Sequence, residues 1–350
     1  MPSRKAYFNR INLATNGKKL PEKTVMDAIA VVGPTASGKT ALSIRLAEEF
    51  NSEIISSDSM QFYQGMEIGT AVPSTEIRKR IPHHFLVFVP PDFRMNAGIF
   101  QELARRELNR IKNEGKVPII VGGSGLYISA LIDGLFEGPA SSEDIRKRLK
   151  KQLVEQGPEH LVKILKDVDP VYFSKLTSPN DIVRVIRALE VYELTGIPFS
   201  EWHRQHQQQA QPLNVLQIAI NWERDILYER INNRVDEMIK EGWIDEVKIL
   251  LEKGYEKDIY RLKALGYREI VYFLKGMQDI STTMCNIKLH HRRYAKRQIT
   301  WFRSDKRVNW IDANPIKSIN DLLYSIYPLI ENFNKNNLPE TYPCFLFRNY

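Results

Sequence analysis

The stretch Gly33-Pro-Thr-Ala-Ser-Gly-Lys-Thr40 decides the fold, because it fits the pattern G-x-x-x-x-G-K-[ST] between an apolar run and a helical pattern. Residues 28–32 before it are all apolar and predict a buried strand, and residues 41–50 after it carry apolar side chains at helical spacing. Such a loop turns backbone N–H groups toward phosphate oxygens, and the following helix N-terminus adds partial positive charge. Lys39 would reach the terminal phosphate, and Thr40 would offer its hydroxyl to Mg²⁺. The sequence predicts a di- or triphosphate site built by Gly33, Pro34, Thr35, Ala36, Ser37, Gly38, Lys39 and Thr40.

Further strands alternate with helices around this loop. Residues 52–56 and 117–121 read as strands, residues 84–89 as another strand candidate, and residues 96–113 as a helix. Asp58 follows the strand at 52–56, and in a parallel sheet the carboxyl ends of strands face the ligand crevice. The pattern predicts an α/β fold, a P-loop NTPase-like parallel sheet flanked by helices, with Asp58 facing the phosphate site.

A helical block interrupts this alternation. Residues 141–195 are wholly helical in pattern, residues 205–212 read as a polar linker, and an apolar strand returns at 215–220. A strand beyond a helical block indicates a helical insertion domain within the sheet domain. We therefore expect a basic, disordered N-terminal arm at 1–26, a core at 27–138 and 213–312, an insertion domain at 139–212, and a C-terminal tail at 313–350. Amphipathic helices are expected at 225–242, 244–254, 268–276 and 281–303.

The composition is that of a soluble globular protein. Hydrophobic residues make up 43% and charged residues 26%, and no apolar run is long enough to cross a bilayer, so no membrane association is expected. Cys285 and Cys344 are the only cysteines, too few for a disulfide framework or a zinc site. These features predict a cytoplasmic protein.

Positive charge is concentrated in two segments, the N-terminal residues 1–23, with six Lys or Arg and one Glu, and residues 288–307. The net charge of the chain is +8, and residues 288–307 alone carry eight Lys or Arg and one Asp. Within them, Arg292 with Lys296 and Arg293 with Arg297 are like charges at four-residue spacing, which destabilise a free helix and call for an anionic partner. With aromatic residues interleaved, the segment is typical of a nucleic-acid surface. An exposed, solvated helix is the alternative.

Two arginines could clamp the phosphates. Arg230 and Arg234 lie one helical turn apart, directly after the strand at 215–220, and guanidinium groups suit phosphate oxygens. No second acidic motif of the kind found in ATPases is evident, since only Asp58 follows an apolar strand. This argues against a helicase or motor and favours a small transferase.

Six ordered blocks resemble one family, the tRNA dimethylallyltransferases, which prenylate N6 of the adenosine next to the anticodon. The blocks are residues 33–40, 58–61 with 65–71, 121–127, 184–190, 265–269 and 295–303, and the resemblance extends from about residue 27 to 312. It implies that the loop binds dimethylallyl diphosphate rather than ATP, and that tRNA enters the opposite end of a channel. The zinc finger of eukaryotic relatives has no counterpart, which implies a bacterial-type enzyme, expected to be monomeric.

The resemblance also implies roles for individual residues. Asp58 would be the general base on the N6 amine, Thr35 a donor to the bridging oxygen, and Arg230, with Lys39 and Thr40, would hold the leaving diphosphate, with Mg²⁺ as cofactor. The implied tRNA contacts are Asp58, Ser59, Met60, Gln61, Ser124, Arg146, Val183, Arg184, Val185, Ile186, Arg187, Ala264, Leu265, Gly266, Tyr267, Arg268, Glu269, Lys296, Arg297 and Gln298.

Three positions depart from the family pattern, and two other functions compete. Val183 stands where Gln is usual, Gln64 where a basic residue is common, and Ser124 where Thr is common.

A small-molecule or nucleoside kinase could use the same loop on ATP, with Asp58 activating a hydroxyl. A nucleotide-gated RNA-binding protein could use it as a switch. The basic helix at 288–307 argues against a small-molecule kinase. The position of Asp58 in the ligand crevice argues against a protein that uses the loop only as a switch.

Overall fold

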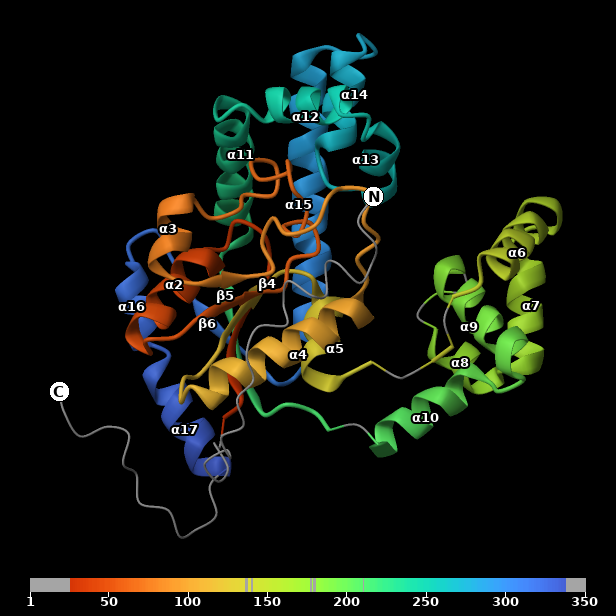
Figure 1. The fold of residues 1–350 in the computed structure, drawn as a ribbon, viewed down its shortest axis with the longest axis horizontal. Helices are drawn as coiled ribbons and strands as arrows, with labels where there is room; N and C mark the ends of the chain where they lie inside the picture. Colours follow the sequence, from red (N-terminus) through yellow and green to blue (C-terminus); the bar gives the residue numbers. More distant parts are fainter. Residues whose placement is uncertain are drawn as a thin grey trace. The chain divides into compact units, whose positions relative to one another are not determined.

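The computed structural model describes residues 26–135, 138–139, 141–176, 178, 181–209 and 211–337 (Figure 1). The arm expected at 1–26 therefore lies almost entirely outside the described residues. The chain divides into two units: one comprises Met1–Met95, Glu102–Tyr127 and Asn214–Tyr350, and the other comprises Asn96–Gln101 and Ile128–Leu213. We describe each unit by itself.

The first unit is built on a six-stranded sheet with the order β3-β2-β4-β1-β5-β6, in which every pairing is parallel. The central strand β1 is buried along its whole length, as is β5 except at its last residue. Continuous apolar runs are expected where helices cover both faces of a parallel sheet. The predicted α/β fold with a parallel sheet is thus confirmed. The strands are β1 (Ala28–Val32), β2 (Ile54–Ser56), β3 (His83–His84), β4 (Ile119–Gly122), β5 (Val215–Asn221) and β6 (Val308–Asp312).

Helices cover the sheet on both faces. One core holds Leu42 and Leu46 of the first helix together with Leu322, Ile326 and Ile330 near the C-terminal end of the described chain. In Figure 1, α16 lies beside α2, so the segment expected only as a tail contains helices that help close the core. The helices of this unit include α2 (Lys39–Glu49), α3 (Thr75–Arg80), α11 (Arg224–Lys240), α12 (Trp243–Glu252), α13 (Glu256–Leu262), α14 (Tyr267–Leu274), α15 (Ile280–Ser304), α16 (Ile319–Tyr324) and α17 (Tyr327–Asn337). Two more, α4 (Ala97–Asn113) and α5 (Gly125–Asp133), extend into both units.

The second unit is helical and has its own apolar core. Leu149, Leu161, Leu165 and Leu189 are at most 1% exposed and pack together around the central helix α9. Asp169 fixes one corner, because its carboxylate accepts from the Tyr172 N–H at 2.9 Å and from the Ser200 N–H at 2.7 Å. The helices are α6 (Glu143–Gln156), α7 (Pro158–Val168), α8 (Pro170–Lys175), α9 (Ile182–Thr195) and α10 (Phe199–Gln209).

Two local predictions were wrong. The apolar run at 84–89 does not form a strand, because β3 ends at His84, and Phe85 and Val87 take positive φ values of 66° and 50°. Tertiary packing overrides the β-propensity of this run. The linker expected at 205–212 is shorter than predicted, since α10 continues to Gln209. Glutamine has a high helix propensity, so the polar run does not by itself end the helix.

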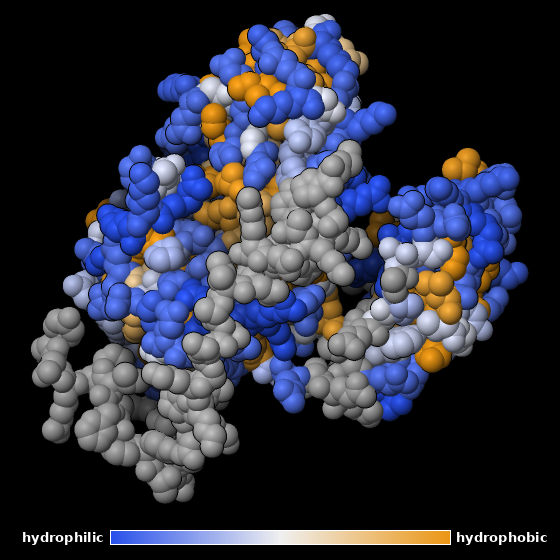
Figure 2. Space-filling model, in the orientation of Figure 1, coloured by the Kyte–Doolittle hydropathy of each residue, from blue (hydrophilic) through white to orange (hydrophobic). Residues whose placement is uncertain are grey.

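The described surface shown in Figure 2 is mainly hydrophilic, as the composition leads one to expect. Among the described residues, no helix is long and apolar enough to cross a membrane. On the face shown in Figure 2, hydrophilic residues cover most of the described surface and hydrophobic residues lie between them in small groups. Isolated exposed apolar side chains of this kind are normal for globular proteins.

Candidate active site

The loops that follow β1, β2 and β4 meet at the carboxyl edge of the sheet and border a cavity of about 250 Å³. The glycine loop contributes Thr35 and Lys39, the segment after β2 contributes Asp58, and α11 contributes Arg234. All the residues that line this cavity belong to the first unit. The predicted meeting of Asp58 with the phosphate loop is therefore present.

The glycine loop has the geometry of a phosphate cradle. Gly33 and Gly38 take φ values of 122° and 96°, in the left-handed region that favours glycine. Lys39 Nζ donates to the Pro34 carbonyl at 2.6 Å, which keeps the ammonium over the loop. Burial and the nearby charge of Arg234 outweigh the opposing effect of Asp58 and lower the pKa of Lys39 to about 7. A bound anion would restore the full charge of this lysine.

The two arginines of α11 lie in different places. Arg234 lines the cavity, and its Nη1 donates to the hydroxyl of Thr35 at 3.3 Å. Arg230 is exposed: its Nε donates to the Ala36 carbonyl at 2.9 Å, and its guanidinium lies 4.3 Å from the ring centroid of Trp222. Arg230, the arginine to which the resemblance gives the clamping role, thus contacts the loop at Ala36 but is not among the residues that line the cavity. Arg234 is the arginine that faces the cavity.

Asp58 is held at the start of a turn. Its Oδ1 accepts from the Met60 N–H at 3.0 Å, and the carboxylate is partly exposed. Tyr294 of α15 also lines the cavity, and burial together with the negative charge of Asp58 raises the pKa of Tyr294 to about 12. This tyrosine stays neutral and can act only as a hydrogen-bonding group at ordinary pH.

A buried carboxylate anchors the segment that contains residues 65–71. Glu246 of α12 accepts from the Ile68 N–H at 2.7 Å, from the Gly69 N–H at 3.1 Å and from the Tyr267 hydroxyl at 2.7 Å. Gly69 is required here, because a Cβ would lie 2.0 Å from Nε1 of Trp243. Tyr267 is fully buried, so two of the sequence blocks, 65–71 and 265–269, are joined through one carboxylate.

A second, basic cavity adjoins the first. It has a volume of about 340 Å³ and shares Lys263, Ala264, Leu265 and Arg297 with the first cavity. Arg268 and Arg293 add two more positive charges to its lining, against the single carboxylate of Glu269. The shared residues place a basic lining next to the cavity at the glycine loop, and such a lining suits the phosphates of a polyanion.

Several residues implied as tRNA contacts are buried. Val185, Ile186, Ala264, Tyr267, Glu269 and Gln298 are at most 8% exposed. Of these, Ala264 and Gln298 line the first cavity and Glu269 lines the second, whereas Val185, Ile186 and Tyr267 line neither. Lys296, Arg297 and Arg268 are exposed, as are Arg184 and Val183. Ser59, Met60 and Gln61 line the first cavity, while Ser124 is buried and holds the Ser59 N–H at 3.1 Å. The structure thus divides these residues into exposed, cavity-lining and buried positions, and their contacts with tRNA stay a prediction.

Two further candidates belong to an ion-pair network in the helical unit. Glu190 is fully buried and accepts from Arg146 at 2.8 Å and from Arg187 at 2.7 Å. Arg187 also donates to the Pro139 carbonyl at 3.0 Å. Hydrogen bonds from both arginines overcome the effect of burial and lower the pKa of Glu190. Both guanidinium groups are thus held in fixed positions by one carboxylate.

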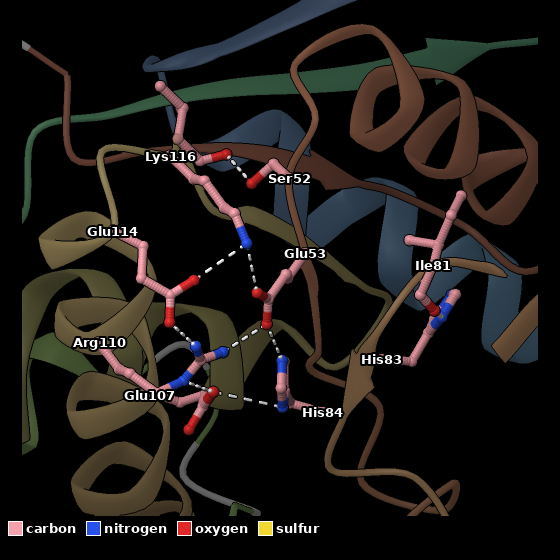
Figure 3. Close-up of polar contacts among 10 residues, drawn as sticks. Ser52, Glu53, Ile81, His83, His84, Glu107, Arg110, Glu114 and Lys116 are labelled. Carbon is pink, nitrogen blue, oxygen red and sulfur yellow. Dashed lines mark hydrogen bonds and ion pairs between the residues drawn. The ribbon is translucent and has the colours of Figure 1, made fainter. Parts of the chain in front are cut away.

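A separate cluster of charges lies at the other edge of the sheet (Figure 3). Glu53 precedes β2, whereas Asp58 follows it, so the two carboxylates belong to opposite ends of that strand. Ligand atoms of Glu53, His84 and Glu107 lie within 4.8 Å of one another. However, Glu53 is already paired with Arg110 and with Lys116, the latter at 2.9 Å, and these cations compete with any metal ion. We interpret the cluster as a structural ion-pair network.

Comparison with known proteins then identifies the family. Residues 61–305 match the family model described as IPP transferase. The chain belongs to the IPP transferase family. The tRNA dimethylallyltransferase of Geobacter metallireducens is 45% identical over 294 residues, which cover 84% of this chain and 94% of that protein. The corresponding enzyme of Geobacter sulfurreducens is 42% identical over 296 residues, covering 85% of this chain and 94% of its own length.

Solved structures of IPP transferases agree. The full-length tRNA isopentenylpyrophosphate transferase of Bacillus halodurans is 37% identical, with a TM-score of 0.66, over 89% of this chain and 97% of that one. A eukaryotic dimethylallyltransferase acting on tRNA is 28% identical, with a TM-score of 0.75, over 89% of this chain and 80% of that one. The family assignment made from the six sequence blocks, and the assignment as an enzyme, are confirmed.

Some residues of the candidate active site were not predicted from the sequence. Met238 and His291 line the cavity, and burial lowers the pKa of His291 to about 4, so its ring is neutral. Met238 follows Arg234 by four residues, and residues at this spacing share a helix face. That spacing was a usable signal for Met238. His291, by contrast, is one of several histidines, and only the packing of α15 distinguishes it.

Proposed function

We propose that the protein transfers the dimethylallyl group of dimethylallyl diphosphate to N6 of the adenosine on the 3′ side of the anticodon in tRNA, with release of diphosphate. The observation that carries the proposal is the single cavity in which the glycine loop, Lys39, Arg234 and Asp58 come together. Family membership supports the reaction class, since the named relatives are tRNA dimethylallyltransferases.

The residues at the glycine loop stabilise the leaving group. In the reaction, the bond between C1 of the allylic chain and the bridging oxygen breaks, and the diphosphate keeps the electron pair. Lys39 and Arg234 place positive charge beside that diphosphate, and the loop N–H groups add hydrogen bonds. Because Arg234 donates to the oxygen of Thr35, the hydroxyl hydrogen of Thr35 can be donated to the bridging oxygen. We assign the clamping role to Arg234 in place of Arg230.

Mg²⁺ fits this donor set. The Thr40 hydroxyl and the Asp58 carboxylate border the same cavity, and hard divalent cations prefer oxygen ligands. When bound, Mg²⁺ would add positive charge to the diphosphate. Thr40 is the residue that we propose to hold the ion.

Asp58 would take the proton. N6 of adenosine is a weak nucleophile whose proton becomes acidic only as the nitrogen–carbon bond forms, so a carboxylate is a sufficient base. Asp58 is partly exposed to the cavity and lies near enough to affect the pKa of Lys39 and of Tyr294. The adenine must leave its stack to reach this carboxylate, which costs unstacking energy that contacts with the tRNA stem must offset.

The test of this assignment is Asp58→Asn. Asparagine keeps the shape and loses the proton acceptor, so the single-turnover rate should fall roughly a hundredfold to ten-thousandfold, while binding of tRNA and of dimethylallyl diphosphate is retained. Thr40→Ser is the control variant in the glycine loop: because it keeps the hydroxyl, we expect its single-turnover rate to fall much less than that of Asp58→Asn. A near-normal single-turnover rate for Asp58→Asn would mean that another group accepts the proton.

The two competing functions are not favoured. A kinase or a nucleotide-gated RNA-binding protein would not account for the close relationship to tRNA dimethylallyltransferases. We propose further that the protein acts as a monomer in the cytoplasm, which is where unmodified tRNA is found in a bacterium.

A further inference from the structure

Gln298 has an unusual position for a residue implied in tRNA binding. It belongs to α15, directly after the exposed residues Lys296 and Arg297, yet its own side chain is only 5% exposed. Its Oε1 accepts from the backbone N–H of Thr35 at 2.9 Å, and its Nε2 donates to the carbonyl of Gly123 at 2.9 Å. The amide thus joins the glycine loop after β1 to the glycine turn after β4.

Both halves of this amide are needed. A backbone N–H requires an acceptor and a carbonyl requires a donor, and a primary amide supplies both at one end of one side chain. Glutamate would lack the donor and lysine the acceptor. Glycine at 123 leaves space for this amide, since a Cβ at that position would lie 2.2 Å from Nε2 of Gln298. The close approach therefore depends on glycine at 123 and on an amide at 298.

The bridge acts on the residue that faces the leaving group. Gln298 fixes the backbone of Thr35, and Arg234 fixes its hydroxyl oxygen at 3.3 Å. Thr35 is therefore held from both sides by two long helices, α15 and α11. The loop must hold a hydroxyl and several N–H groups at the correct distances from the diphosphate. Contacts from residues behind it, such as Gln298, keep it in that arrangement before the ligand binds.

We propose that Gln298 is a positioning residue for the diphosphate loop, and that it does not contact tRNA. It acts through Thr35 and Gly123, which it holds in the arrangement that receives the diphosphate. The inference rests on the proposed function only in taking a diphosphate as the ligand of the loop. It assigns to Gln298 a role different from that of its exposed neighbour Lys296.

The test compares Gln298→Met with Lys296→Ala. Methionine has nearly the same length but can neither accept nor donate strongly. We expect Gln298→Met to weaken binding of inorganic diphosphate with Mg²⁺ by about tenfold or more and to lower the single-turnover rate roughly tenfold to a hundredfold, while the Kd for unmodified tRNA changes less than about twofold. Lys296→Ala should show the reverse pattern, with weaker tRNA binding and unchanged diphosphate binding.

Gln298→Asn provides a second variant if the methionine variant does not fold. It keeps an amide but is one methylene too short to reach both loops, so it should also weaken diphosphate binding selectively. A loss of tRNA affinity with unchanged diphosphate affinity would overturn the proposal in favour of a tRNA contact. An equal loss of both, with a lower melting temperature, would overturn it in favour of a general structural role. Failure of the wild-type protein to bind diphosphate would refute the proposed function itself.

Discussion

Replacing each arginine of α11 by glutamine separates the two candidate clamps. Arg234 faces the cavity and contacts Thr35, whereas Arg230 is exposed and braced against Ala36 and Trp222. A hydrogen bond from a charged group is worth about 1.5–3 kcal/mol, so Arg234→Gln should weaken dimethylallyl diphosphate binding by roughly tenfold to more than a hundredfold. We expect a loss near the lower end of this range. Removing Arg234 takes a like charge away from Lys39 and raises the pKa of Lys39, so that this lysine is more fully charged and compensates in part.

Arg230→Gln is the matched control on the same helix. Its guanidinium contacts the Ala36 carbonyl and the Trp222 ring and does not line the cavity, so we expect less than about a tenfold loss of affinity. Calorimetric titration with dimethylallyl diphosphate and single-turnover rates with saturating tRNA measure both effects. An equal loss for the two variants, or a larger one for Arg230→Gln, would refute the assignment of the clamp to Arg234.

Three other predictions follow from the charges. The pKa of Lys39 is about 7 without ligand and should rise when diphosphate binds, so affinity for dimethylallyl diphosphate should fall as pH rises from 7 to 9, with proton uptake on binding; calorimetry in two buffers tests this, and pH-independent affinity would contradict it. Glu53→Gln should lower the free energy of unfolding at pH 7 by about 1–3 kcal/mol. Because hydrogen bonds from Lys116, His84 and Arg110 overcome the effect of burial and lower the pKa of Glu53 to about 2, the difference between wild type and variant should be complete above pH 4.5 and shrink as pH falls through 2; a constant difference in acid unfolding curves would exclude this origin. Neutralising Lys296 and Arg297 should reduce the slope of log affinity for tRNA against log salt by about 0.7 to 0.9 per lost phosphate contact, and an unchanged slope would make this part of α15 a merely solvated surface.

The glycine loop could be predicted because local pattern and local structure coincide there. An apolar run, the loop motif and a helix follow one another within about twenty residues, and each restricts the next. Asp58 could be placed beside the loop for a similar reason, since parallel strands end at one edge. Both features lie in the cavity as expected.

What the sequence did not decide depends on tertiary packing. Arg230 and Arg234 share one face of α11 in the sequence, and only the way in which that helix lies against the loop shows which of them faces the cavity. Gln298 stands among basic residues, yet it points inward to two backbone groups. The apolar run at 84–89 satisfied the strand pattern but bends at Phe85 and Val87, where positive φ values interrupt the ladder. Facing directions and long-range contacts of this kind are set by the assembled core.

The most direct test of the account is a single incubation with a chemical readout. The protein is mixed with unmodified tRNA, Mg²⁺ and either dimethylallyl diphosphate or ATP, and the tRNA is digested and its nucleosides are analysed by mass spectrometry. The account predicts one prenylated adenosine, located next to the anticodon, with dimethylallyl diphosphate and none with ATP. Transfer of phosphate from ATP to an acceptor, with no prenylated nucleoside in either reaction, would contradict it.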